Sequence, residues 1–389
     1  VVALFMGLST GASVLVAQHY GAKDRAALSK VVHTNFAIAL YGGLVLTIFT
    51  VIFTPQFLAW IDTPPEVMGP AVRYMRILFA GLIPVMVYNM GSAVLRSVGD
   101  SVRPFNFLAI AAGLNIVLDL IFVGAFKMGA VGAGIATVLA QSVSGILVLL
   151  SLLKTTDIYR LRMKRIRFHK ETLNHIVAIG LPAAVSGGLI SLSNVIIQAQ
   201  INVFGAQAIA GVAAASRVDG FVFTSLEAFA LAITTFVGQN IGAKKPKRLK
   251  SGIITALVMT LLFVASVSSI LVIFRTPLMK IFTSEKDVIF YGTKMIVILA
   301  PFYVIFSVTE VLSGAIRGSG TAVPIMIITL IGMFIIRLGW IFTAMPMYKT
   351  IDIICWSYPI SWVFTCILTL IYYFKGKWRK NMDVPEAKK

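Results

Sequence analysis

The apolar residues of this chain fall into long runs of roughly 20 residues, separated by short polar segments. A run of that length, coiled as an α-helix, crosses a bilayer core of about 30 Å. The runs do not alternate apolar and polar residues as barrel strands do, and lipid offers no partner for free backbone groups. The pattern therefore predicts an all-α integral membrane protein. Its eleven predicted spans are 1–20, 34–54, 72–95, 104–125, 130–153, 175–203, 207–240, 251–274, 289–314, 323–345 and 351–374.

The composition supports this environment. Hydrophobic residues make up 58% of the 389 positions, and charged residues only 13%. A soluble domain of this size has about a quarter of its residues charged. The composition therefore excludes a soluble protein.

The net charge of +19 is distributed unevenly between the predicted loops. Of the 34 Lys and Arg residues, 24 lie in the alternate loops of one side, eight in those of the other, and Arg217 and Arg337 inside spans. Basic loops stay in the cytoplasm, so the richer side is predicted to be cytoplasmic, together with the C-terminus. The charge is thus a matter of membrane topology, and we expect no nucleic-acid partner.

The chain also repeats itself at an offset of 221 residues. Val-Ala-Gln-His-Tyr-Gly-Ala-Lys at 16–23 recurs as Val-Gly-Gln-Asn-Ile-Gly-Ala-Lys at 237–244. Arg-Ser-Val-Gly at 96–99 recurs as Arg-Gly-Ser-Gly at 317–320. Because this offset contains an even number of spans, both copies cross the membrane in the same sense. Parallel repeats are one known plan of secondary transporters, with the binding site between the halves.

The repeat predicts two pseudo-symmetric lobes of six helices each, twelve spans in all. The span 175–203 has no repeat partner in the chain, and its counterpart would precede Val1. We therefore expect the chain to be truncated at its N-terminus and to lack the first helix of the first lobe. The predicted parts are an N-lobe at 1–153, a basic cytoplasmic linker, expected to be a helix at the lipid surface, at 154–174, a C-lobe at 175–374 and a cytoplasmic tail at 375–389.

Three motifs resemble those of a known family. They are Gly-Gln-Asn-Ile-Gly-Ala-Lys at 238–244 with its degenerate twin at 18–23, Arg-Ser-Val-Gly-Asp at 96–100 followed by Pro104, and Gly-Leu-Pro at 180–182. Together with the repeat they resemble the multidrug and toxic compound extrusion (MATE) transporters, most closely the prokaryotic branch that includes the DinF-like proteins. The resemblance implies a two-lobed, twelve-helix exporter around a central cavity. It also implies antiport, in which entering H⁺ or Na⁺ drives out an organic, often cationic, compound.

Ionisable residues at bilayer depth are costly, by at least 2–3 kcal/mol each, and are therefore candidates for function. Asp119 follows Asn115 by one helical turn, so both lie on one face. The resemblance implies a cation-coupling pocket formed by Asp119, Asn115, Thr137 and Asn89. A carboxylate shielded from water takes up a proton more readily, and oxygen donors can bind Na⁺. The alternative is a structural hydrogen-bond network that locks two helices together.

The remaining intramembrane charges suggest a substrate cavity in the second lobe. Its candidate residues are Glu310, Glu227, Arg337 and Arg217. Alternatively, Glu310 pairs with Arg337 or Arg217. Asp219 could lie at the outer interface and simply be solvated. Three aromatic side chains could line a cavity for hydrophobic cations: Phe221, Phe223 and Phe229.

The sequence contains no Walker-type loop, HExxH, CxxC or Gly-x-Ser-x-Gly motif, so we expect a transporter and not an enzyme. We expect no cofactor, and no metal beyond Na⁺ at the coupling site. The main alternative is a flippase of lipid-linked oligosaccharide or another lipid, which would need more than two intramembrane Arg or Lys residues to hold phosphates. An ion channel or scaffold is disfavoured by the parallel repeat. The expected setting is a monomer in the plasma (inner) membrane of a prokaryote, with a small organic molecule and membrane lipid as partners.

Overall fold

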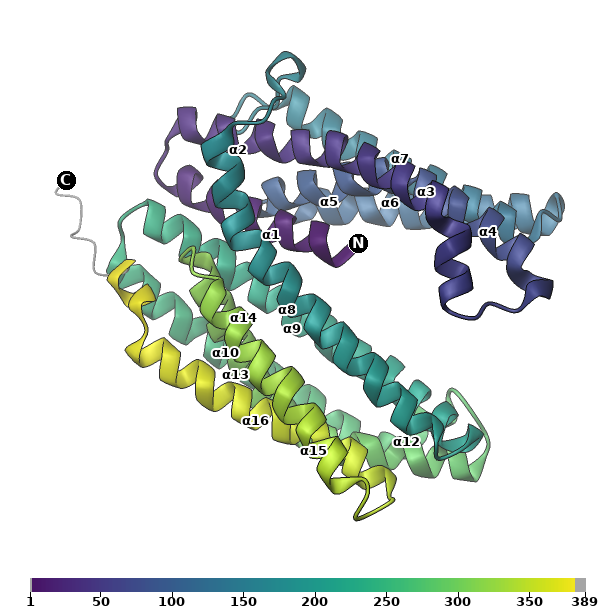
Figure 1. Ribbon diagram of the computed structural model, residues 1–389. Helices are drawn as coiled ribbons and strands as arrows, with labels where there is room; N and C mark the ends of the chain where they lie inside the picture. Colours follow the sequence, from purple (N-terminus) through teal and green to yellow (C-terminus); the bar gives the residue numbers. More distant parts are fainter. Residues whose placement is uncertain (1, 382–389) are drawn as a thin grey trace. The chain divides into compact units, whose positions relative to one another are not determined.

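The computed structural model describes residues 2–381, and these form α-helices with short 3₁₀ and π segments and no strand (Figure 1). The predicted tail at 375–389 lies outside the described residues from 382 onward. Contacts divide the chain into two compact units. They are the N-unit, Leu8–Val177, and the C-unit, Val1–Gly7 with Ala178–Lys389.

In the N-unit, α7 is the central helix and packs against α4, α5 and α6. Its small residues Gly134 and Gly145 allow this close approach, because a Cβ at Gly145 would lie 2.9 Å from the carbonyl oxygen of Pro84. The elements are α1 (Val2–Gly21), α2 (Arg25–Ala37), η1 (Ile38–Gly42), α3 (Gly43–Trp60), α4 (Pro65–Ala80), α5 (Leu82–Ser97), α6 (Val102–Asp119), η2 (Leu120–Ala125), α7 (Gly129–Lys154) and η3 (Met163–Arg165).

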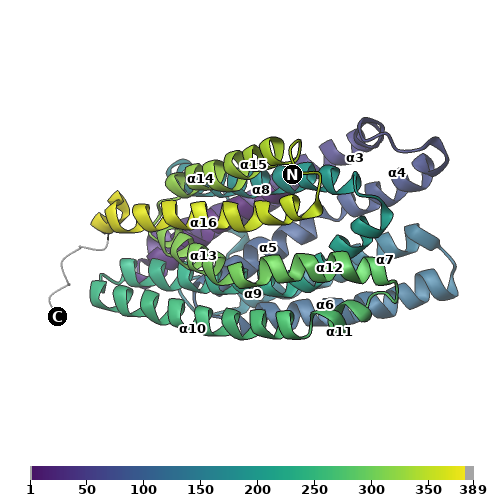
Figure 2. The same cartoon turned by 90° about the horizontal axis from the view of Figure 1, so that it is seen from below.

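In the C-unit, α9 takes the central position and packs against α10, α12 and α13, which run alongside it (Figure 2). Tyr303 and Trp362 are fully buried in the core of this unit. The elements are α8 (Lys170–Asn202), which belongs to this unit from Ala178 onward, α9 (Ala206–Gly242), α10 (Pro246–Ile273), α11 (Arg275–Lys280), α12 (Lys286–Leu299), η4 (Ala300–Phe302), α13 (Tyr303–Gly318), α14 (Val323–Thr329), η5 (Leu330–Ile336), α15 (Arg337–Ala344), α16 (Ile351–Lys375) and η6 (Lys377–Asn381).

The helices confirm the predicted class of integral membrane protein. Within the described residues, nine helices are long and apolar enough to cross a membrane, or ten when the bent pair α4–α5 counts as one span. The eleventh predicted span, 1–20, coincides with α1, which is not among these ten. The pair α4–α5 bends by 41° beside Gly81. Pro84 explains the bend, because it has no backbone N–H to continue the hydrogen bonding of α4 into α5.

The internal repeat is visible in the backbone. A shift of 221 residues places α5 on α13 from end to end and brings the start of α4 onto the start of α12. The same shift relates the left-handed residues Lys23 (φ 57°) and Lys244 (φ 53°), and also Gly99 (φ 98°) and Gly320 (φ 90°). Residues that break helices therefore recur at the same places in both units.

The linker differs from the expectation of a surface helix. Residues 155–169 contain a turn at 158–159 and the single 3₁₀ turn Met163–Arg165, and the next α-helix begins at Lys170. The side chains of Tyr159 and Leu161 are buried against the N-unit, and the Leu161 N–H donates to the Leu152 carbonyl (3.0 Å). Burial of these two side chains on the same unit favours an extended course over a helix. The predicted linker is thus part of the N-unit.

Candidate functional site

The four predicted coupling residues lie on three helices of the N-unit. Asn89 is on α5, Thr137 on α7, and Asn115 with Asp119 on α6. The helix α7 packs against both α5 and α6. Asp119 is the last residue of α6 before the π-helical turn η2, and such turns are frequent at functional sites.

The side chains of these residues do not bond to one another. Asn89 Nδ2 donates to the Val85 carbonyl (2.9 Å) and Thr137 Oγ1 to the Ala133 carbonyl (2.9 Å), both within their own helices. Among the described residues, Asn115 Nδ2 and Asp119 Oδ1 are buried and have no hydrogen-bond partner. In the described residues these four side chains therefore form no direct hydrogen bond with one another.

The donor set fits a small cation. Asp119 offers carboxylate oxygens, Asn89 and Asn115 offer amide oxygens, and Thr137 offers a hydroxyl. These are the ligand types that hard cations prefer, and the carboxylate can equally accept a proton. An unpaired buried carboxylate oxygen costs free energy unless such a partner satisfies it.

A second polar group lies in the C-unit, where α9 packs against α13. Glu310 lies on α13 and Glu227 on α9, the two helices that pack together here. Arg317, two turns along α13, approaches Glu310 with a distance of 3.8 Å between Nη2 and Oε2. The expected alternative partners, Arg337 and Arg217, do not pair with Glu310. Arg337 is held on another helix pair, and Arg217 is exposed on α9 about 15 Å along the axis from Glu227.

Arg337 is the most deeply buried charge of the C-unit, with 2% of its surface exposed. Its Nε donates to Ser361 Oγ (3.0 Å), Nη1 to Asn194 Oδ1 (3.3 Å) and Nη2 to Met333 Sδ (3.2 Å). The guanidinium also lies 4.7 Å from the ring centre of Tyr358. These neutral contacts connect α15 with α8, η5 and α16.

Asp219 is buried, so the alternative of a solvated residue at the outer interface is wrong. Only 3% of its surface is exposed, and it neighbours the hydroxyl of Tyr303. Helical spacing could have shown this, because Asp219 shares a face of α9 with the buried residues Ala215, Val222 and Leu226. Asp219 Oδ1 and Tyr303 Oη have no hydrogen-bond partner in the described part of the chain.

The opposite face of α9 is exposed within the C-unit. It carries Arg217, Phe221, Thr224 and Glu227 at intervals of three and four residues. The Phe221 side chain is 80% exposed. Of the other two predicted cavity aromatics, Phe223 packs in the core against Tyr303, Phe306 and Trp362, and Phe229 packs against Phe263. Phe223 is therefore a core residue.

Comparison with known proteins places this arrangement in a family. The MatE family model matches residues 1–121 and 182–343. The probable multidrug resistance protein NorM of Thermotoga maritima is 27% identical over 388 residues, which cover 97% of this chain and 82% of that protein. The probable multidrug resistance protein YoeA of Bacillus subtilis is 26% identical, with coverage of 97% and 83%. The multidrug export protein MepA of Staphylococcus aureus is 23% identical, with coverage of 99% and 86%.

Solved structures agree with this assignment at the level of the fold. A crystal structure of MATE in the bent conformation superposes with a TM-score of 0.91 at 21% identity, covering 98% of this chain and 86% of that one. An outward-facing multidrug resistance MATE family transporter of the MOP superfamily gives a TM-score of 0.90 at 22% identity, with coverage of 96% and 84%. The chain therefore belongs to the MatE family, and it is a multi-pass membrane transporter and not an enzyme.

Proposed function

We propose that this protein is a cation-coupled antiporter that exports small organic, often cationic and amphiphilic, compounds. The observation that carries the proposal is the carboxylate oxygen Oδ1 of Asp119, which is buried without a partner among the described residues, one helical turn from Asn115, within the span formed by α6 and η2. An intramembrane carboxylate without a protein partner is suited to bind and release a cation during each cycle. The names of YoeA, NorM and MepA, which refer to multidrug resistance or export, agree with such a cargo.

The coupling step in this proposal belongs to Asp119. Entering H⁺ neutralises the carboxylate, or entering Na⁺ binds it together with the oxygens of Asn115, Thr137 and Asn89. Either event changes the charge at bilayer depth, and with it the relative free energies of the conformations that face the two sides of the membrane. The inward gradient of the cation then drives the conformational cycle.

The substrate contacts in this proposal lie in the C-unit. The exposed face of α9 carries Glu227 and Phe221, and Glu310 lies on α13, which packs against α9. A carboxylate beside an aromatic ring suits an organic cation with apolar groups. Arg217 lies on the same face, whereas Arg337 keeps α8 attached to α15. We infer a monomer in the plasma membrane of a prokaryote, with the basic loops in the cytoplasm.

Uptake of ethidium into everted membrane vesicles tests the proposal. Vesicles whose lumen is acidic, or rich in Na⁺, should accumulate the dye, and an ionophore that collapses the active gradient should stop uptake. Uptake that ignores both gradients would rule out coupled antiport. A flippase would instead move a fluorescent lipid across the bilayer of the same vesicles while leaving ethidium outside.

A further inference from the structure

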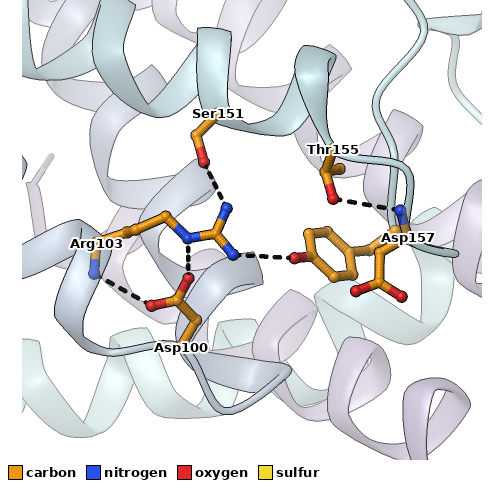
Figure 3. A network of polar contacts seen from close by, with 6 residues as sticks. Asp100, Arg103, Ser151, Thr155 and Asp157 are labelled. Atoms are coloured by element: carbon orange, nitrogen blue, oxygen red, sulfur yellow. Dashed lines mark hydrogen bonds and ion pairs between the residues drawn. The ribbon is translucent and has the colours of Figure 1, made fainter.

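The linker is held against the N-unit at its first half by a polar network (Figure 3). Arg103, at the start of α6, forms an ion pair with Asp100. Its Nη1 donates to Ser151 Oγ (3.1 Å) on α7, and its Nη2 donates to the hydroxyl of Tyr159 (3.4 Å) in the linker. The start of the linker is therefore tied to two helices at once.

The second half of the linker is held by α2. The buried His33 accepts the N–H of Arg162 at Nε2 (3.0 Å), and its Nδ1–H donates to the Ser29 carbonyl (2.6 Å). The N–H of His169 donates to Thr34 Oγ1 (3.3 Å). The backbone between Tyr159 and His169 thus has fixed contacts at both ends and at its centre.

This fixed segment presents a dense array of cations. Six basic side chains are exposed within eleven residues: Arg160, Arg162, Lys164, Arg165, Arg167 and Lys170. Among the described residues, the side chains of Arg162, Lys164, Arg165 and Lys170 make no hydrogen bond or ion pair. Positive charge held in place without acidic partners attracts an anionic ligand.

The surroundings of Phe168 indicate which class of anion binds these basic side chains. Its ring lies 5.7 Å from that of Tyr41, and both rings are about half exposed. Tyr41 is the first member of an exposed apolar stripe that continues with Val45, Ile48 and Ile52. These residues belong to a helix that can span a membrane, and an exposed apolar stripe on such a helix is suited to contact lipid. A tyrosine at the end of such a stripe marks the interface between acyl chains and headgroups.

We propose that Lys164, Arg165 and Lys170, with the Phe168–Tyr41 pair, form a binding site for the headgroup of an anionic phospholipid. The basic side chains that flank Phe168 lie at the level of the phosphates, while the aromatic pair rests on the acyl-chain boundary. A nucleic acid or an acidic peptide would also bind the basic side chains. Neither would require an aromatic pair that continues into the apolar stripe, whereas a phospholipid with its acyl chains would.

Native mass spectrometry of the full chain in a neutral detergent tests this site, with phosphatidylglycerol as the probe and phosphatidylcholine and inorganic phosphate as comparisons. In the triple variant Lys164→Gln, Arg165→Gln, Lys170→Gln, we expect the affinity for phosphatidylglycerol to fall by about fivefold per charge, roughly a hundredfold in all. The matched control removes three charges from the other basic loop, through Lys245→Gln, Arg248→Gln and Lys250→Gln, and should bind as the unchanged protein does.

Phe168→Ala, which keeps every charge, should also weaken phosphatidylglycerol binding and provides a second test should the triple variant fail to fold. Equal loss in the two triple variants would mean that the lipid responds only to the overall charge, and would overturn the proposal. Competition by inorganic phosphate at equal ionic strength would do so too, because the site would then recognise phosphate and not a lipid. The readout is binding, so the result does not depend on whether the protein transports anything.

Discussion

At the scale of single residues, buried charges of this molecule are held in two different ways. Arg337 has neutral partners on three other elements, so its guanidinium is satisfied by the protein itself. Asp119 has a buried oxygen without any partner in the described residues. A buried charged group whose hydrogen bonds are all made by the protein is suited to a structural role. A buried charged group without a protein partner is suited to bind and release a ligand.

We therefore expect Asp119→Asn to abolish coupled efflux while expression and melting temperature stay near those of the unchanged protein. The amide keeps the shape of the side chain but removes the charge that accepts a proton or binds Na⁺. The control is Asp62→Asn, an exposed loop acid with a φ of 54° that asparagine tolerates well. Efflux of ethidium measured across a range of pH decides the matter, and an unchanged profile in Asp119→Asn would assign this residue a structural role.

Glu310 should behave differently from Asp119. We expect Glu310→Gln to change the range or affinity of substrates more than the dependence on the coupling ion, because its carboxylate already has Arg317 nearby and its helix packs against α9, which carries Glu227. Concentration series with several dyes under each ion gradient would measure both effects. A shifted pH profile in Glu310→Gln with none in Asp119→Asn would move the coupling site to the C-unit.

At the scale of elements, the contact between α9 and α13 depends on glycine. A Cβ at Gly314 would lie 2.6 Å from the Ala230 carbonyl oxygen and 2.7 Å from Ile233 Cγ2, so the helices would have to separate. We expect Gly314→Ala to lower stability by roughly 1–3 kcal/mol. Gly113→Ala on α6, where nothing lies within 4 Å, should be neutral or slightly stabilising. Thermal melting in detergent compares the two, and an equal response would show that α13 can shift freely.

The linker should respond to acid through His169. Its pKa is lowered, first by partial burial and then by the charges of Arg167, Lys30 and His33. Arg167 Nε donates to His169 Nε2 (3.3 Å), a bond that the protonated ring cannot accept. The folded state prefers the neutral His169 ring. The neutral ring therefore stabilises the folded linker fully above the ordinary pKa of 6.5, and this stabilisation is lost as the pH falls through the lowered pKa.

Hydrogen exchange of the linker amides should therefore be faster at about pH 5.5 than at pH 7.5, after correction for the intrinsic rates. His169→Gln keeps a polar side chain without this titration and should reduce the difference, and the part that remains should disappear when His33, whose pKa burial also lowers and which accepts the Arg162 N–H, is replaced by Gln as well. A difference that persists in this double variant would place the titrating group elsewhere.

At the scale of the whole molecule, the sequence predicts the long elements well and the irregular segments poorly. Apolar runs and the repeat of 221 residues anticipate the spans and the shared bounds of α5 and α13, because both follow from local composition. The course of the linker does not follow from composition. It depends on Tyr159 and Leu161 finding a buried place on the N-unit, which only the folded chain provides.

The candidate site shows the same division. The spacing of Asn115 and Asp119, one turn apart, predicts the residue types of the coupling pocket. That Asn115 Nδ2 and Asp119 Oδ1 have no partner among the described residues is instead a property of the packed helices. The burial of Asp219 follows from helical spacing, whereas its proximity to Tyr303, far along the chain, does not. Local sequence patterns thus predict which residues are buried, but they do not predict contacts between elements that are far apart in the chain.

Membrane orientation is the last property that the whole chain determines. Of the 34 basic residues, 24 lie in loops of one side and eight in those of the other, which predicts that the linker is cytoplasmic and the loop before α16 is external. In a cysteine-free background, with the buried Cys355 and Cys366 replaced by alanine, Lys349→Cys should react with an impermeant maleimide in intact cells. Lys164→Cys should react only after the membrane is opened. Labelling of Lys164→Cys from outside would invert the topology, and the basic array of the linker would then face the wrong leaflet for the anionic lipids of the cytoplasmic surface.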